Sequence, residues 1–165
     1  MVSDTQKAFK VLQTAILQAP ALSLPTGSGF NLFVTETKGM ALGILTQARG
    51  SHRQPIAYLS RKLDVISRGW PHCLRVIGAA ALLAPEALKI INRRNFIVLT
   101  SHDVSGILNS KVNIWMTDSR LLKYQSLLFQ GPKIKLKVSG NLNPATFLPE
   151  KENETPDHNC SQYLI

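Results

Sequence analysis

The sequence has 165 residues, 44% of them hydrophobic, which is enough to enclose the core of one ordinary globular domain. Lys and Arg number 19 against ten Asp and Glu, and four of those acids fall in the last sixteen residues. Residues 5–149 therefore carry 18 basic and five acidic side chains. A body this basic favours a polyanion or an acidic protein surface as its partner.

The cysteine count and the distribution of apolar residues exclude several classes of protein. Two cysteines, Cys73 and Cys160, are too few for a disulfide-stapled secreted domain, and they form no zinc-binding motif. The polar N-terminus is unlike a signal peptide, and the most apolar run, residues 76–91, is interrupted by Pro85 and Glu86. We expect an intracellular, cytoplasmic protein that holds neither a metal nor another cofactor.

The first element predicted is a helix that ends at Pro20. Ser3 and Gln6 have the spacing of a capping box, and apolar residues recur on one helical face until the proline. A connector rich in Pro, Gly and Ser follows over residues 20–29.

Three strands should come next. They are predicted at residues 30–35, 40–47 and 55–60, with a turn at 36–39 and a basic loop at 49–53. Gly43 inside the second strand indicates a close backbone approach or a bulge. Pro55 suits the first residue of the third strand, where no ladder donor is needed.

The second half alternates helices and strands. Pro71 suits the first turn of a long helix that Pro85 should kink or restart. The remaining elements are predicted at 95–100 (strand), 103–108 (helix), a helix capped by Thr117 or Asp118, and 133–138 (strand). Residues 141–165 are expected to form a strap and a loose acidic tail.

This order predicts an α/β fold with a five-stranded mixed sheet. Three strands meander antiparallel, helical crossovers add two parallel strands, and helices pack on the sheet. We expect residues 1–25 to be a helix and connector, 26–149 the main domain and 150–165 an acidic tail.

Several segments resemble one family in sequence. They are LFVTE at 32–36, GILTQ at 43–47, RQPIAYLSRKLD at 53–64, GWPHCLR at 69–75, LTSH at 99–102, NPATFLP at 143–149 and HNC at 158–160. Together they resemble the connection domain of gammaretrovirus-type reverse transcriptases, over about residues 5–162. The resemblance implies a ribonuclease H-like fold, derived from an endogenous retroviral polymerase, without fingers, palm or the true ribonuclease H domain. Either the gene has lost those parts or the chain was trimmed.

The resemblance also locates the positions at which live relatives carry catalytic carboxylates. Those positions correspond to Thr35, Val76, Ser101 and Thr146, all neutral here. Two-metal hydrolysis needs several converging carboxylates, so we expect a domain that is not an enzyme. Glu36 and Asp103, next to two of these positions, are expected to be solvated or capping acids, and Glu36 should point away from Thr35.

Basic clusters supply the candidate nucleic-acid contacts. We select Arg49, Arg53, Arg61, Lys62, Arg93 and Arg94, with Trp115 as an exposed aromatic for base stacking. Solvated loop charge is an equal alternative, and it is the preferred reading of Lys133, Lys135 and Lys137. Tyr58 and Trp70 are expected to pack internally. His72 beside Cys73 is read as structural, because no orienting acid is near in sequence.

The predicted function is a non-catalytic binding module. Its partner would be an RNA–DNA hybrid or other nucleic acid, bound weakly and in a salt-dependent way, or polymerase domains or a host protein. Three alternatives stay open: a residual nuclease, a host protein-interaction factor with no nucleic-acid role, and a decayed product without function. No membrane partner is expected.

Overall fold

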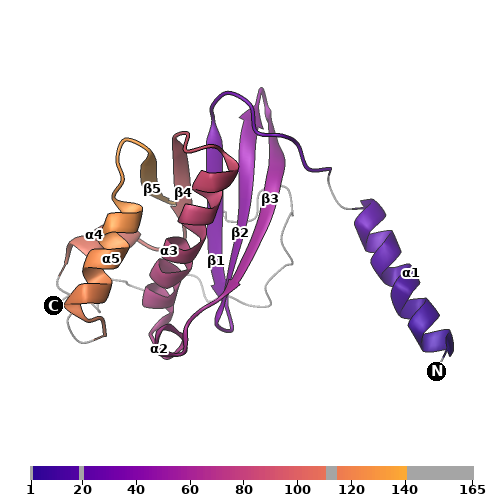
Figure 1. The fold of residues 1–165 in the computed structure, drawn as a ribbon, viewed down its shortest axis with the longest axis horizontal. Helices are drawn as coiled ribbons and strands as arrows, with labels where there is room; N and C mark the ends of the chain where they lie inside the picture. The colour runs from indigo at the N-terminus through magenta and orange to yellow at the C-terminus, as the bar shows by residue number, and fades with distance from the viewer. Residues whose placement is uncertain (1, 19–20, 111–114, 141–165) are drawn as a thin grey trace.

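A computed structural model describes residues 2–18, 21–110 and 115–140 of the chain. Its centre is one five-stranded sheet with the order β3-β2-β1-β4-β5 (Figure 1). The strands are β1 (Phe30–Thr37), β2 (Met40–Arg49), β3 (His52–Lys62), β4 (Phe96–Thr100) and β5 (Ile134–Val138). β1, β2 and β3 pair antiparallel, whereas β4 and β5 join β1 in parallel. The predicted mixed sheet is confirmed.

Helices cover one face of this sheet. They are α2 (Val65–Arg68), α3 (His72–Ile90), α4 (Val104–Asn109) and α5 (Asp118–Leu128). α3 packs against β1 and β2, and α5 packs beside α3 (Figure 1). Alternate residues of β1 (Phe30, Leu32 and Val34) join α3 in one hydrophobic core, because successive strand residues point to opposite faces. α3 is buried along most of its length.

The first three strands are longer than the sequence indicated. Glu36 and Thr37 still belong to β1, and the turn is only Lys38-Gly39, with φ of 50° and 80°. Two residues with positive φ are what a tight hairpin requires, and a four-residue turn at 36–39 was therefore wrong. The β2–β3 turn is equally short, so His52 and Arg53 lie in β3 rather than in a basic loop.

Pro55 is the fourth residue of β3, not the first. The β2–β3 register shifts between Leu45 and Thr46, which pair with Ala57 and Pro55. This irregularity leaves one extra residue in β3, and β3 is an edge strand, so a proline without N–H costs little there. The bulge therefore lies beside Pro55 rather than at Gly43.

The helices also depart in detail from the prediction. α1 (Val2–Gln18) begins before Ser3, so Ser3 is a residue of the first turn and not a cap. α3 continues through Pro85 as one helix, since its packing against the sheet and α5 outweighs one missing hydrogen bond. Thr117 caps α5 by accepting from the Arg120 N–H, as predicted. α2 was not predicted. The expected strap and tail lie outside the described residues.

α1 stands away from the rest of the structure (Figure 1). Its large apolar side chains are exposed: Phe9, Val11, Leu12, Ile16 and Leu17. An isolated helix of 17 residues is marginal in water, because most helix stability in proteins comes from packing an apolar face. Among the described residues, no helix is long and apolar enough to cross a membrane.

α3 approaches β2 closely at Gly43. A β-carbon built on Gly43 would lie 2.8 Å from Leu83 Cδ1 and 3.4 Å from the Phe33 carbonyl oxygen. The predicted close approach is confirmed, and the missing side chain lets the helix lie against the strand.

We therefore expect Gly43→Val to destabilise the fold by about 1–3 kcal/mol, as overpacking does. Urea denaturation would measure the change. Gly140→Val is the control, because a β-carbon on Gly140 would meet no atom within 4 Å. Equal destabilisation by the two variants would contradict the packing argument.

Candidate nucleic-acid interface

Three of the four positions predicted to correspond to catalytic carboxylates lie on β1, in α3 and directly after β4. Thr35 is on β1, Val76 is buried in α3, and Ser101 is an exposed residue directly after β4. β1 and β4 pair with Phe33 opposite Leu99, so Thr35 and Ser101 lie two residues further along neighbouring strands. Thr146 lies outside the described residues.

Thr35 and its neighbour Glu36 point to opposite sides of the sheet, as expected. Glu36 contacts Arg75 of α3, so Thr35 points to the face that α3 does not cover. The structure therefore does not bring Thr35 and Val76 together on one side of β1.

Glu36 is not a solvated acid. Only 2% of the residue is exposed, and Gly39 N–H donates to its Oε1 at 2.6 Å. Arg75 Nε lies 3.0 Å from its Oε2, as does His72 Nδ1. The prediction of a solvated or capping role was wrong. The sequence does not show which face of β1 packs against α3, and Glu36 lies on that face. Asp103 does cap α4, accepting from Gly106 N–H at 2.9 Å.

The contact between Glu36 and His72 also corrects the prediction that no orienting acid lies near His72. An orienting acid is present after all, contributed by β1 rather than by a sequence neighbour. His72 also meets the His102 ring edge to face, at 5.1 Å between centroids. Cys73 is buried in the hydrophobic core. Within the described part of the chain, no three His, Cys, Asp or Glu side chains gather closely enough to hold a metal ion.

Four of the selected basic residues lie at one end of the sheet. Arg49 and Arg53 flank the β2–β3 turn, and Arg93 and Arg94 follow α3 near the start of β1. Two of the four hold the connector. Arg49 donates to the Leu24 carbonyl and Thr26 Oγ1 at 3.3 and 3.1 Å, and Arg94 donates to the Gly27 carbonyl at 3.3 Å.

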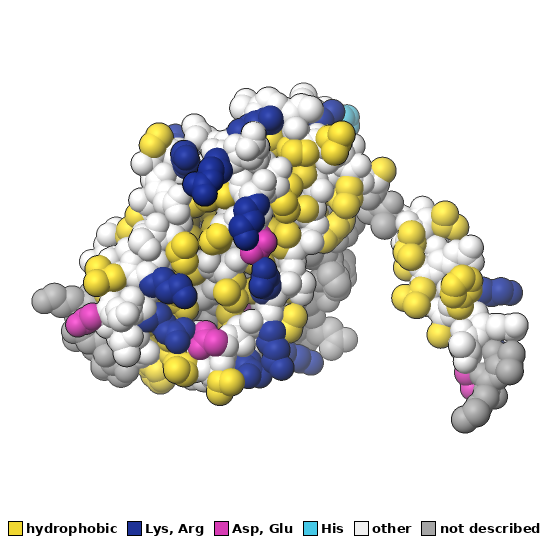
Figure 2. Space-filling view, in the orientation of Figure 1, with side chains coloured by type: hydrophobic (Ala, Val, Ile, Leu, Met, Phe, Trp, Pro, Cys, Tyr) yellow, Lys and Arg dark blue, Asp and Glu magenta, His cyan; other side chains and the backbone are white. Residues whose placement is uncertain are grey.

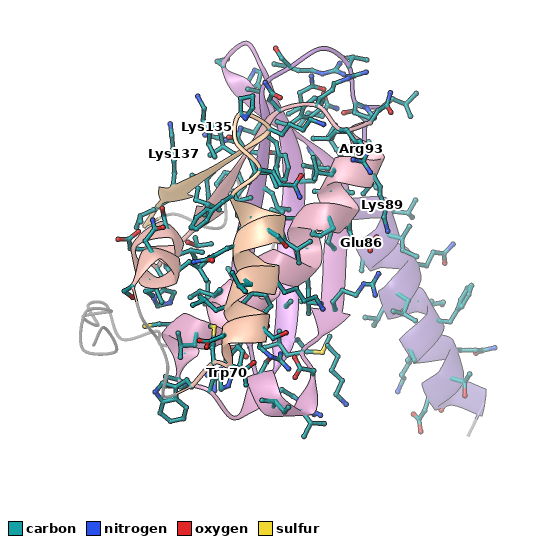
Figure 3. The ribbon with its side chains drawn as sticks, turned by 60° about the vertical axis from the view of Figure 1, so that its left-hand side comes forward. Trp70, Glu86, Lys89, Arg93, Lys135 and Lys137 are labelled. Atoms are coloured by element: carbon teal, nitrogen blue, oxygen red, sulfur yellow. The ribbon has the colours of Figure 1, made fainter. Side chains whose placement is uncertain are left out.

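The guanidinium of Arg53 lies over the Phe33 ring, 5.1 Å from its centroid. Arg53 therefore lies on the sheet face opposite α3. Figure 3 shows Arg93 far from Trp70, which marks the other end of the molecule.

Arg61 and Lys62 are at that other end. Arg53 and Arg61 are eight residues apart on β3, which is about 26 Å at 3.3 Å per residue. Arg61 forms an exposed ion pair with Glu86 at 2.8 Å. The structure thus separates the predicted contacts into two groups rather than one groove.

The aromatic candidates are divided by exposure. Trp115 is 42% exposed, as predicted, and lies just before α5. Trp70 is buried, also as predicted, and contacts Tyr124 edge to face. Tyr58 is 41% exposed, so its predicted internal packing was wrong; it is a residue of the edge strand β3.

A hollow of about 560 Å³ between α3 and α5 was not predicted. Lys62, Arg120 and Lys123 line it together with one acid, Asp64, and an apolar wall that includes Leu82 and Leu127. Figure 2 shows several Lys and Arg side chains on the helical face of the molecule, with a few acidic side chains among them. Lys62 alone of these was selected from sequence, because only the packing of α5 on α3 brings the other two beside it.

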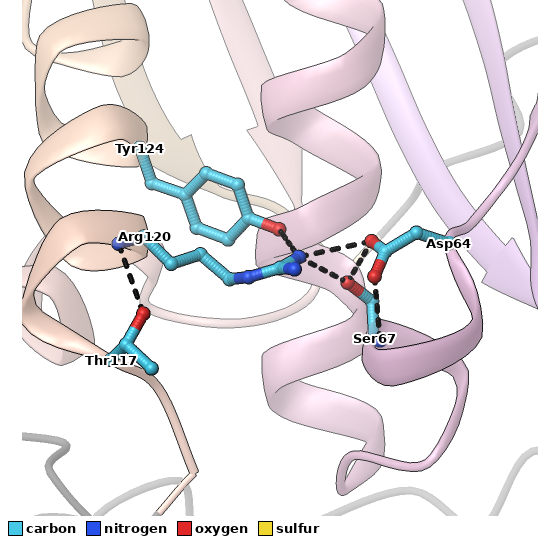
Figure 4. Close-up of polar contacts among 5 residues, drawn as sticks. All are labelled: Asp64, Ser67, Thr117, Arg120 and Tyr124. Carbon is cyan, nitrogen blue, oxygen red and sulfur yellow. Dashed lines mark hydrogen bonds and ion pairs between the residues drawn. The ribbon is translucent and has the colours of Figure 1, made fainter.

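Asp64 anchors one wall of the hollow (Figure 4). It caps α2 by accepting from the Ser67 N–H at 3.2 Å and also accepts from the Ser67 hydroxyl. Arg120 Nη1 donates to Asp64 Oδ1 and Ser67 Oγ, both at 3.0 Å, and lies 3.4 Å from the Tyr124 hydroxyl. Partial burial favours a higher pKa for Asp64, but the hydrogen bonds from Ser67 and Arg120 outweigh it and lower the pKa to about 2.

The architecture defines the class of protein. Three antiparallel strands, a helical crossover and two parallel strands form a ribonuclease H-like fold. The family model of the RNase H-like domain found in reverse transcriptase matches residues 27–130, and the chain belongs to this family.

Curated relatives confirm the resemblance to gammaretrovirus-type polymerases. The chain is 45% identical over 160 residues to the Gag-Pol polyprotein of avian reticuloendotheliosis virus, covering 96% of the chain and 14% of the polyprotein. It is 41% identical over 163 residues to the Gag-Pol polyprotein of baboon endogenous virus (strain M7), covering 98% and 9%. The chain thus spans a small part of each relative.

Solved structures share the fold. A foamy viral protease-reverse transcriptase in complex with RNA/DNA hybrid gives a TM-score of 0.65 at 12% identity, covering 95% of this chain and 21% of that one. The same enzyme in complex with dsDNA gives 0.66 at 12% identity, covering 90% and 30%.

The buried Glu36 should contribute measurably to stability. We expect Glu36→Gln to cost about 1–3 kcal/mol, because it leaves the partly exposed Arg75 without its carboxylate. Glu86→Gln, which removes the surface ion pairs of Glu86 with Arg61 and Lys89, should cost less than about 1 kcal/mol. Chemical denaturation of both variants measures the contrast, and equal effects would contradict a structural role for Glu36.

The low pKa of Asp64 predicts a pH dependence. A carboxyl with a folded pKa of about 2, below its ordinary 3.8, stabilises the native state fully above the ordinary value. That contribution is lost as the pH falls through 2. The stability difference between the wild type and Asp64→Asn, followed by urea denaturation from pH 6 to pH 2, should therefore shrink towards acid. A difference that stays constant would count against the Arg120–Asp64 pair.

Proposed function

We propose that this chain is a non-catalytic connection domain, of endogenous retroviral origin, that binds nucleic acid through its basic surfaces in the cytoplasm. In this proposal residues 26–149 are the binding unit, 1–25 a helix and connector, and 150–165 an acidic tail. Membership of the reverse transcriptase family and the excess of 18 basic over five acidic residues in 5–149 support it. So do the foamy viral relatives in complex with dsDNA and RNA/DNA hybrid.

The contacts of the Glu36 carboxylate are the observation that supports the non-catalytic part of this proposal. Two-metal hydrolysis requires several carboxylates that converge on a pair of ions about 4 Å apart. Glu36 is the acid next to the degenerate positions, and Arg75, His72 and the Gly39 N–H already occupy its oxygens. Replacing Arg75 by two divalent ions would require neighbouring acids that Thr35, Val76 and Ser101 do not supply.

The binding part depends on charge at both ends of the sheet. Arg53 and Arg93 lie at the β2–β3 end, whereas Lys62 and Lys123 border the hollow at the other. Lysine and arginine side chains contact phosphates without reading sequence. Binding should therefore be weak and independent of sequence, and it should fall steeply with salt.

A salt titration with an RNA–DNA hybrid tests this proposal. Fluorescence anisotropy would give the slope of log affinity against log salt for the wild type and three variants. The slope should fall in magnitude by about 0.9 for every phosphate that no longer meets a basic side chain. We expect this fall in Arg49→Ala/Arg53→Ala and also in Lys62→Ala/Lys123→Ala. Lys135→Ala/Lys137→Ala is the matched control, because it removes two charges from the edge strand β5 and should leave the slope unchanged.

Arg49 also holds the connector, so each variant is first compared with the wild type by thermal denaturation. No detectable binding at low salt, or an equal reduction of the slope in all three variants, would contradict the nucleic-acid role. The same samples with Mg²⁺ or Mn²⁺ should leave the RNA strand intact. Cleavage that Glu36→Gln or Asp103→Asn abolishes would overturn the non-catalytic assignment.

A protein-binding role is the second candidate, and α1 favours it. Phe9, Leu12 and Ile16 recur at helical spacing and are all more than 60% exposed. Such a face fits the apolar surface of a polymerase domain or a host protein. Hybrid binding that is absent at low salt, together with an interaction that Leu12→Asp removes, would favour this function.

A further inference from the structure

The hollow between α3 and α5 carries cations that no described acid neutralises. Arg120 is paired with Asp64, but neither Lys62 nor Lys123 forms an ion pair within the described residues. Both lysines are exposed beside the apolar wall at Leu82 and Leu127. The hollow is therefore suited to a short acidic segment of protein.

The chain leaves the sheet at the end where Lys62, one of the residues that line this hollow, lies. β1, β3, β4 and β5 all run in the same direction, so their last residues lie at the same end of the sheet. Lys62 is the last residue of β3, and Ser139 follows β5, where its N–H donates to the Thr100 carbonyl at 2.8 Å. The segment after Gly140 starts from this same end of the sheet.

The sequence beyond that point carries most of the available negative charge. Glu150, Glu152, Glu154 and Asp157 lie within eight residues that contain one basic side chain, Lys151. The nine residues 141–149 span at most about 30 Å when extended, which is enough to cross a small domain. The most acidic segment of the chain is thus tethered at the same end of the sheet as Lys62, although β5 and β3 are its opposite edge strands.

We propose that residues 150–157 bind the α3–α5 hollow of their own chain, with their carboxylates on Lys62 and Lys123. The other basic end is a poorer site, because Arg49 and Arg94 already donate to the connector. Tethering raises the effective concentration of the segment far above that of any free competitor. The acidic segment also competes with nucleic acid for these lysines, a step that rests on the proposed function.

Paramagnetic relaxation in the full chain tests the contact directly. A spin label is placed by Asn153→Cys in a Cys160→Ser background, since Cys73 is buried and 1% exposed. We expect the amide signals of Lys62 and of residues 117–123 to broaden. The broadening should disappear with Glu150→Gln/Glu152→Gln/Glu154→Gln/Asp157→Asn, and at high salt.

Matched charge removals locate the site. Lys62→Ala/Lys123→Ala should abolish the broadening, whereas Lys135→Ala/Lys137→Ala should preserve it. Broadening that is absent in the wild type, or that centres on residues 49–53, would overturn the proposal. These outcomes do not depend on nucleic acid, so they separate this proposal from the binding function.

Hybrid affinity then tests the competition. Neutralising the four acids should tighten binding by about threefold or more at low salt, because an intramolecular competitor is removed. In the Lys62→Ala/Lys123→Ala background the same neutralisation should give a clearly smaller gain. Equal gains in both backgrounds would show that the acids act only through net charge and would overturn the competition.

Discussion

The contact between Glu36 and Arg75 joins the elements on which the rest of the structure depends. It connects the end of β1 to the first turns of α3, 39 residues later, while Gly39 of the β1–β2 turn donates to the same carboxylate. His72 links this cluster to His102 after β4. A buried carboxylate is costly unless it is paired and hydrogen-bonded, so one position of α3 satisfies Glu36 far better than any other.

That arrangement gives the buried carboxylate of Glu36 partners from its own chain within a ribonuclease H-like scaffold. An active site of this kind holds several acids close together, which repel one another until metal ions bind. In this chain the acid Glu36 lies beside the guanidinium of Arg75 and the imidazole of His72. The charge cluster at this edge is balanced by the protein's own side chains.

Charge on the surface follows from the same topology. Because β3 and β5 run in the same direction, Lys62 of the hollow and the exit of the chain after β5 lie at the same end of the sheet. The β2–β3 turn and the residues after α3 lie at the opposite end, where arginines hold the connector. The two basic regions are therefore chemically different: one is engaged with backbone carbonyls, and the other surrounds an open hollow.

Most of the fold was predictable from sequence, because it depends on local patterns. The crossover helix after Pro71, the alternating strand at 134–138 and the Thr117 cap follow from periodicity and local hydrogen bonding. Strand ends were less predictable, since pairing with a neighbour extended β1 through Glu36 and β3 across Pro55. The candidate site was the least predictable. The partners of Glu36 and the grouping of Lys62 with Lys123 come from residues far apart in the chain.

The sequence by itself determined the family, the order of helices and strands apart from α2, and the excess of basic charge, and it predicted neutral residues at the catalytic positions. These are properties of residue identity and short-range spacing, which do not depend on how elements pack. Only the tertiary structure decided that Glu36 is buried against Arg75, and that the basic residues form two separate groups. Those outcomes depend on which face of β1 meets α3 and on where α5 lies, and packing of distant elements alone settles both.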